Sequence, residues 1–196
     1  MKSAYIVSGL RTAVGKAKKG GFRFVRPDDL AANVIKSLVK KTKGLEGIMV
    51  DDLIVGNAVP EAEQGMQMAR YISLLSLPKE VPGLVINRYC GSGLEAIHLA
   101  CAKINAGSAE CVIAGGTESM SMVPMTGYKS ALNYNISVNN PDYYLNMGLT
   151  AEKLAKKYDI KREDSDLFSF NSHMKATKAI EDNIFKKEIL PYDVEQ

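Results

Sequence analysis

Residues 81–116, VPGLVINRYCGSGLEAIHLACAKINAGSAECVIAGG, place a segment of helical length between two apolar runs. The runs 83–89 and 110–116 have the length and the β-branched content of buried strands, and turn residues bound them. A strand, helix and strand in this order predict two parallel strands joined by a helix that covers one face of the sheet. This segment therefore indicates an α/β fold.

The same alternation continues towards the N-terminus, where a helix with proline at its entry and glycine at its exit precedes a further strand and helix. We therefore predict one α/β core over 1–118, with a mainly parallel sheet and helices on both faces. In chain order, the segments before residue 81 are a short apolar run at 4–9, a helix at 27–43, a strand at 51–58 and a helix at 63–76.

Cys90 lies where the strand 83–89 meets the glycine-rich start of the next helix. The first backbone N–H groups of a helix have no intrahelical acceptor, so this position favours an anion such as a thiolate. Gly91 and Gly93 leave the sulfur open to a substrate carbonyl. In parallel sheets ligands bind at the carboxyl ends of the strands, which is where Cys90 lies. The pattern predicts a nucleophilic cysteine.

The alternative for any cysteine is packing as a small apolar group. For Cys90 the polar residues just before it and the glycines after it favour a site. Cys111 lies inside an apolar strand, and Cys101 continues an apolar helical stripe, so we interpret both as packing residues. The stripe consists of Leu94, Ile97, Cys101 and Ile104.

A second use of the same turn is phosphate binding, because residues 91–96, GSGLEA, also fit the glycine fingerprint of dinucleotide-binding folds. That fingerprint needs an acidic residue about 20 positions on, at the end of the next strand. Here that strand ends in Ala114, Gly115 and Gly116, and Glu118 comes later, in a loop. A dinucleotide-binding oxidoreductase therefore stays open as an alternative function.

Composition excludes several classes of protein. The net charge of +3 over 196 residues is too small to indicate a nucleic-acid partner. The basic stretch 11–26 indicates either a solvated loop or a contact for a phosphorylated ligand. Three cysteines without CxxC spacing and two histidines argue against a disulfide framework or a metal site. Neither a signal peptide nor a membrane span is predicted, so we expect a reduced, cytoplasmic protein.

After residue 118 the alternation of strands and helices ends. The stretch 117–148 has no clear period and predicts a covering loop, and helices follow at 149–159 and 162–185. Four methionines could line a flexible acyl pocket, although gap-filling is the commoner use of this residue. These are Met120, Met122, Met125 and Met147, and the apolar stripe of the last helix is Leu167, Phe170, Met174, Ala176, Thr177 and Ile180.

Four motifs in order, VSGLRTAVGK at 7–16, INRYCGSGLEAI at 86–97, AGGTESMS at 114–121 and MGLTAEKLAKKYDIKREDSD at 147–166, make the chain resemble the thiolase family. The resemblance implies a five-layered fold of two similar halves, with a helical loop domain inserted in the first. Residues 1–118 would be the first core, and 119–196 part of the loop domain that covers coenzyme A.

The resemblance also implies an activity, which is acyl transfer between a 3-ketoacyl-CoA and coenzyme A, or the reverse condensation of acetyl-CoA, in a homodimer or homotetramer without a permanent cofactor. By this match Cys90 carries the acyl group and its backbone N–H belongs to an oxyanion hole. Met147 would lie beside the acyl pocket. Asn146 stands where short-chain members often have histidine.

The family's second half is absent from this sequence, and with it a GHP histidine that activates the nucleophile and a CxGxG cysteine that acts as acid and base. His98 cannot replace that histidine, because eight residues of helix place it about 12 Å along the axis from Cys90. His173 lies in the far helix among polar residues. We expect the first part of a thiolase, either a fragment of a longer protein or a half that another chain completes, with little or no activity by itself; the alternative is a non-catalytic assembly module.

Overall fold

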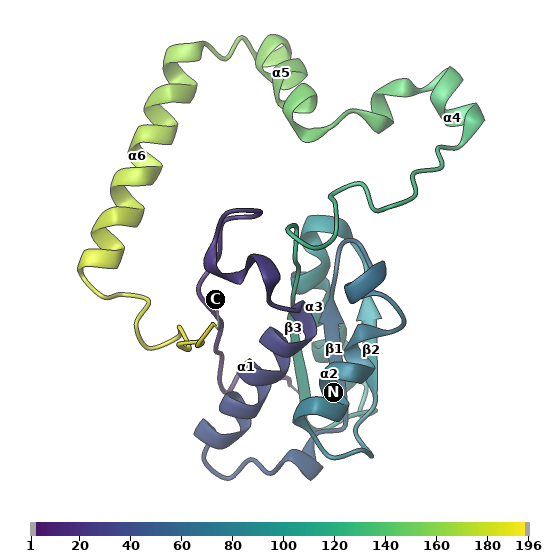
Figure 1. The fold of residues 1–196 in the computed structure, drawn as a ribbon, viewed down its shortest axis with the longest axis vertical. Coiled ribbons are helices and arrows are strands. Elements are labelled where there is room, and N and C mark those ends of the chain that lie inside the picture. The colour runs from purple at the N-terminus through teal and green to yellow at the C-terminus, as the bar shows by residue number, and fades with distance from the viewer. Residues whose placement is uncertain (1–2, 195–196) are drawn as a thin grey trace. The chain divides into compact units, whose positions relative to one another are not determined.

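The computed structural model describes residues 3–194 and divides the chain into two units (Figure 1). The first unit runs to Lys129 and includes the chain again from Glu188, and the second spans Ser130–Lys187. The sequence placed its boundary between residues 118 and 119. The assignment of 119–196 to a coenzyme A-covering loop domain stays a prediction.

A three-stranded parallel sheet forms the centre of the first unit. Strand β1 (Asp52–Gly56) lies between β2 (Gly83–Ile86) and β3 (Val112–Gly116). In the register, Val55 pairs with Val85 on one side and with Gly115 on the other. All three strands therefore end at the same edge of the sheet.

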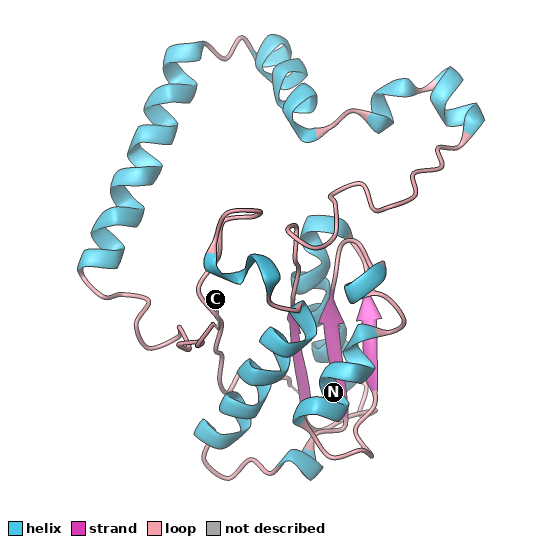
Figure 2. Cartoon of the chain, viewed as in Figure 1, coloured by secondary structure: helices cyan, strands magenta, loops and turns pink. Residues whose placement is uncertain are grey.

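Helices cover both faces of this sheet (Figure 2). Helices α1 (Pro27–Lys41) and α2 (Met68–Ser76) pack on one face, and α3 (Ser92–Asn105) packs on the other. Leu53 and Val55 point to the first cluster, while Ile54 between them points to α3, as alternation along a strand requires. The predicted parallel sheet with helices on both faces is confirmed.

The apolar run 4–9, for which the sequence predicts neither helix nor strand, forms no strand, and Tyr5, Ile6 and Val7 are about four-fifths exposed. One segment differs from the sequence prediction. The helix predicted from residue 63 begins at Met68. Just before it, Met66 and Gln67 adopt positive φ angles of 50° and 58°, which an α-helix does not allow.

The predicted core face of α3 is wrong. Leu94 is 74% exposed and Ile97 37% exposed, whereas the residues turned to the sheet are the small Ser92, Ala96 and Ala100. Small side chains face the sheet because α3 lies close against β1, and Leu94 and Ile97 consequently point outward. The helical spacing of apolar residues predicted an apolar face on this helix, but a different face packs against the sheet.

Asp51 connects the starts of β1 and β3, because its Oδ2 accepts hydrogen bonds from the N–H groups of Glu110 (2.6 Å) and Cys111 (3.0 Å). These bonds, the one from Glu110 first, lower the pKa of Asp51 below its ordinary value of 3.8. A carboxyl with a lowered pKa stabilises the fold above the pKa of the unfolded chain, and this contribution is lost as the pH falls through the folded-state pKa.

We expect Asp51→Asn to lower the free energy of unfolding by up to about 1 kcal/mol at neutral pH. The difference from wild type should shrink as the pH falls below about 4, because the unfolded wild-type chain then takes up a proton that the folded chain does not, until the folded carboxyl is protonated too. Urea unfolding at several pH values measures this. Asp166→Asn, in an exposed pair with Arg162, serves as control. A difference that stays constant with pH would contradict the assignment.

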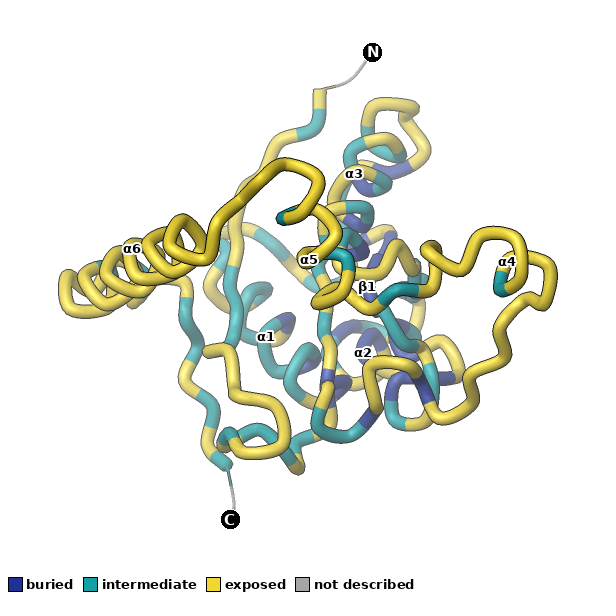
Figure 3. Tube along the Cα trace, turned by 90° about the horizontal axis from the view of Figure 1, so that it is seen from above, coloured by how far each residue is buried: buried dark blue, intermediate teal, exposed yellow. Residues whose placement is uncertain are grey.

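The second unit consists of helices linked by loops. Helices α5 (Met147–Tyr158) and α6 (Arg162–Glu181) match the two predicted helices, and a short helix, α4 (Tyr134–Asn139), interrupts the stretch that the sequence predicted as loop. No residue of α4, α5 or α6 is buried, so the predicted stripe of α6 lies exposed (Figure 3). Asn146 caps α5, its Oδ1 accepting the N–H of Leu149 at 2.9 Å.

Candidate functional site

The carboxyl ends of the three strands meet and are joined by hydrogen bonds. Asn57, after β1, donates its backbone N–H to the carbonyl of Ile86 (3.0 Å), and Thr117, after β3, donates its N–H to the carbonyl of Gly56 (3.2 Å). The buried side chain of Asn57 also donates to the carbonyl of Thr117 (2.9 Å). We call these joined strand ends the platform; its residues are Gly56, Asn57, Ile86 and Thr117. The segment after β2 starts from it.

Cys90 lies on this platform, in the turn between β2 and α3, as the sequence predicted. A single 3-10 turn, Tyr89–Gly91, leads directly into α3, and the Cys90 side chain is exposed. The structure gives the Cys90 thiol and its backbone N–H no hydrogen-bond partner among residues 3–194. An exposed sulfur and an unpaired N–H at the start of a helix form an arrangement that suits attack on a carbonyl.

Close contact with β1 fixes the start of α3. A Cβ atom on Gly56 would lie 2.5 Å from the carbonyl oxygen of Ser92 and 2.6 Å from the backbone nitrogen of Gly93. Only glycine leaves room at this point, so the backbone of the last residue of β1 touches the first turn of α3. The nucleophile turn is therefore held by main-chain packing.

Charged residues near Cys90 pair with one another. Arg88 Nε lies 3.0 Å from Glu95 Oε2, and His98 Nδ1 lies 4.0 Å from the other carboxylate oxygen of Glu95. The His98 side chain is 76% exposed. His98 thus faces solvent from the second turn of α3, beside Glu95, and its exclusion as a base for Cys90 stays a prediction. His173 lies in α6, in the other unit.

Cys101 and Cys111 are half-buried. Cys111 packs against the cluster under α1 and α2, as expected for a packing residue, and burial raises the pKa of its thiol above the ordinary value. Cys101 shares the outward-facing side of α3 with Ile97.

Glu118, the acidic residue that follows β3 too late for the dinucleotide fingerprint, hydrogen-bonds to other residues of the chain. Its Oε2 accepts the backbone N–H of Ala58 (2.7 Å) and its Oε1 accepts a hydrogen bond from Gln64 Nε2 (2.7 Å). Both oxygens therefore hold the loop that follows β1.

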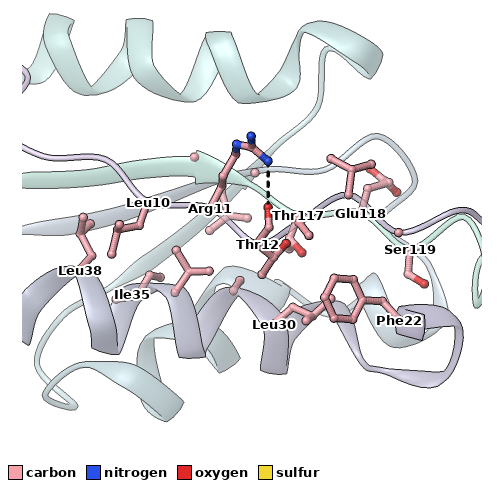
Figure 4. Close-up of a pocket in the computed structure, with 18 of the residues that line it drawn as sticks. Leu10, Arg11, Thr12, Phe22, Leu30, Ile35, Leu38, Thr117, Glu118 and Ser119 are labelled. Atoms are coloured by element: carbon pink, nitrogen blue, oxygen red, sulfur yellow. Dashed lines mark hydrogen bonds between the residues drawn. The ribbon is translucent and has the colours of Figure 1, made fainter. Parts of the chain in front are cut away.

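A cavity of about 490 Å³ runs along the outer side of β3, between this strand, α1 and the segment 8–17 (Figure 4). Its walls are largely apolar, with Leu30, Ile35 and Leu38 from α1, and the Arg11 guanidinium donates to the carbonyl of Thr12 (3.2 Å) within it. Cys90 does not line this cavity. Of the four methionines in the predicted acyl pocket, Met120 lines it.

Met147 is the first residue of α5, in the second unit, with a side chain 67% exposed. Its place beside an acyl pocket stays a prediction. Within residues 3–194, no cluster of three His, Cys, Asp or Glu side chains could hold a metal ion, and no helix is long and apolar enough to cross a membrane.

Sequence reasoning missed the side chains that hold the Cys90 turn. Asn87 and Ser92 both hydrogen-bond to the backbone of Tyr89. In the sequence, Asn87 is one of the polar residues just before Cys90. An asparagine two residues before a tight turn commonly accepts a nearby backbone N–H, and this is the signal that points to it.

Comparison with known proteins places the whole chain in one family. The family model described as "Thiolase, N-terminal domain" matches residues 4–196. The chain is 52% identical to the 3-ketoacyl-CoA thiolase of Bacillus subtilis (strain 168) over 195 residues, which cover 99% of this chain and 50% of that protein.

The 3-ketoacyl-CoA thiolases of Enterobacter sp. (strain 638) and Aliivibrio salmonicida (strain LFI1238) are each 39% identical to it, over 97% of this chain and 49% of their own length. The chain thus spans about half the length of the curated relatives it matches. With the parallel sheet, the helix that follows Cys90 and a match to the family model over nearly every residue, the chain belongs to the thiolase family and corresponds to its N-terminal domain.

Proposed function

We propose that this chain is the nucleophile-bearing part of a thiolase-type acyltransferase, and that Cys90 carries the acyl group as a thioester. The observation that carries the proposal is the exposed Cys90 thiol at the start of α3, next to a backbone N–H without an acceptor among residues 3–194. The family match and the names of the relatives, 3-ketoacyl-CoA thiolases, support the substrate class.

In the proposed reaction the Cys90 thiolate attacks the keto carbon of a 3-ketoacyl-CoA. The carbonyl electrons move to the oxygen, which the Cys90 N–H stabilises. When the carbonyl re-forms, the bond between C2 and C3 breaks, and the departing carbon takes up a proton to give acetyl-CoA. The thiolate of free coenzyme A then attacks the thioester, releases a shortened acyl-CoA and restores the Cys90 thiolate. The reverse sequence condenses two acetyl groups.

Proton transfer at Cys90 needs a base and an acid. Among the described residues of the first unit, no histidine is hydrogen-bonded to Cys90, and the His98 side chain is 76% exposed on α3. We propose that the base and the acid belong to the thiolase's second half, carried by a separate chain or by a longer form of this protein. The isolated chain should then turn over very slowly, since each acid or base contributes about 10²–10⁴-fold.

Further properties belong to the same proposal. Acyl-CoA and coenzyme A are the substrates, with no permanently bound cofactor, and the loop region from Ser119 with Met147 contributes to their binding. The protein forms a homodimer or homotetramer and acts in fatty acid metabolism in a reduced, cytoplasmic compartment. Neither a nucleic acid nor a membrane is its partner.

The test is the intact mass of the protein after incubation with a 3-ketoacyl-CoA or with acetyl-CoA, followed by peptide mapping. We expect one acyl adduct, on Cys90, because this thiol is exposed beside an N–H donor. Cys90→Ala should abolish the adduct, a loss of at least about 10³-fold in its rate of formation.

The matched control is Cys101→Ala, which removes a half-buried thiol from the same helix and should acylate at the wild-type rate. If wild type forms no adduct while Cys90 still reacts with iodoacetamide, the isolated chain is not a competent half-enzyme. An adduct on Cys101 or Cys111 would contradict the assignment of the nucleophile.

A second candidate, an assembly module without catalysis, is favoured by the outward face of α3, where Leu94 and Ile97 are exposed apolar residues. Light scattering tests it. Self-association that Leu94→Glu abolishes, in a protein that forms no acyl adduct on Cys90, would support this candidate, and a strictly monomeric protein would count against it.

A further inference from the structure

Tyr89, the residue before Cys90, has a backbone conformation that its side chain disfavours. Its φ angle is +46°, in the left-handed region, and an aromatic residue there is an outlier that the surrounding structure must hold in place. Because Cys90 follows directly, the orientation of the Tyr89 peptide sets the direction of the Cys90 N–H. Whatever holds Tyr89 therefore also positions the group that would bind the substrate oxygen.

Two side chains hydrogen-bond to the backbone N–H and the backbone carbonyl of Tyr89. The Tyr89 N–H donates to Asn87 Oδ1 (2.8 Å), and the Tyr89 carbonyl accepts a hydrogen bond from Ser92 Oγ (2.6 Å). Ser92 Oγ in turn accepts the N–H of Arg88 (2.8 Å), and Ser92 is 3% exposed. Ser92 thus connects both sides of the turn from a buried position.

The other end of the Asn87 amide ties this turn to the loop after β1. Asn87 Nδ2 donates to the carbonyl of Ala58 (3.0 Å), and the N–H of Ala58 donates to Glu118 Oε2 (2.7 Å). The loops after β1, β2 and β3 are therefore linked in one hydrogen-bonded chain that ends at Tyr89. Asn87 makes two bonds in opposite directions, which a purely local turn would not need.

We infer that Asn87 and Ser92 are positioning residues, whose side chains hold Tyr89 in its left-handed conformation and so aim the Cys90 N–H at the oxygen of the bound acyl group. The inference rests on the proposed function. Oxyanion donors act through accurate placement, so loss of this support should slow acylation and leave the accessibility of the sulfur unchanged.

The variants are Asn87→Ala, Ser92→Ala and Asn87→Asp, which keeps an acceptor for the Tyr89 N–H. Matched controls are Asn133→Ala, which removes a comparable bond to the N–H of Ile136 (3.1 Å) in the second unit, and Ser73→Ala, which removes a buried hydroxyl bound to Val81. Each variant is measured for acylation of Cys90 by acetyl-CoA and for alkylation by iodoacetamide, a small reagent that needs no oxyanion site.

We expect Asn87→Ala and Ser92→Ala to slow acylation by about tenfold or more, with alkylation changed by less than about threefold, and Asn87→Asp to recover part of the acylation rate. In a Tyr89→Gly background, where positive φ is allowed, Asn87→Ala should cost much less. Acylation and alkylation that fall together, or controls that lose as much, would overturn the inference.

Amide hydrogen exchange keeps the two proposals distinguishable. If wild type forms no acyl adduct, the proposed function of the isolated chain fails, and exchange at Tyr89 alone decides this inference. Asn87→Ala should accelerate exchange of the Tyr89 N–H by about tenfold or more, and Asn133→Ala should not. Unchanged exchange at Tyr89 would overturn it.

Discussion

Gly56→Ala is expected to destabilise the first unit by about 3 kcal/mol and to slow acylation of Cys90. The added methyl group would lie 2.5 Å from the Ser92 carbonyl oxygen and 2.6 Å from the Gly93 nitrogen, both backbone atoms that no rotamer change can move away. The start of α3 must therefore shift, together with the turn that carries Cys90. Urea unfolding followed by circular dichroism gives the first effect, and the rate of adduct formation gives the second.

Gly115→Ala is the matched control, because Gly115 lies beside Val55 on the neighbouring strand and a Cβ there would meet no atom within 4 Å. It should change the free energy of unfolding by less than about 1 kcal/mol. Equal effects at the two glycines would show that the contact between β1 and α3 does not limit either property.

Lys103→Met should cost about 3 kcal/mol, the second large effect. Lys103 Nζ, on the last turn of α3, pairs with the carboxylate of Asp52, whose side chain is only 8% exposed. Removing the lysine leaves a carboxylate with little access to water, and a buried charge without its partner costs about 3–5 kcal/mol. The lower value applies here because the Lys103 side chain is one-third exposed. Thermal and urea unfolding both measure it.

The combined variant Asp52→Asn with Lys103→Met should recover part of this loss, since no unpaired charge remains. Lys153→Met is the control. It breaks an ion pair with Asp142 in which both side chains are more than half exposed, and should cost less than about 1 kcal/mol. If the two lysine variants lose the same stability, burial of Asp52 is not the cause.

The elements that local signals specify could be predicted from the sequence. The three strands, the helices other than α4 and the position of Cys90 at a strand-to-helix junction followed from apolar runs, periodicity and glycines in the turn. The inner face of α3 could not, because close packing against Gly56 reserves that face for Ser92, Ala96 and Ala100, and periodicity carries no information on how near two elements lie.

The support of the nucleophile turn was also beyond sequence reasoning. It depends on contacts between residues far apart in the chain, such as Asn87 with Ala58 and Ala58 with Glu118, which are brought together only by the parallel order of the strands. The run 4–9 is apolar and yet forms no strand, because an apolar composition does not by itself supply a neighbouring strand that would pair with it.

Ala58, which follows the platform residue Asn57, takes part in these bonds through its peptide groups alone, with its N–H bound to Glu118 and its carbonyl bound to Asn87. Position 58 can therefore vary in side chain without loss of either bond, as long as the new residue fits the space. Proline is the exception, because it has no N–H to donate. A library of all residue types at position 58, selected for folded protein, should thus retain most of them and lose proline. This pattern is expected of a residue that contributes only its backbone hydrogen bonds.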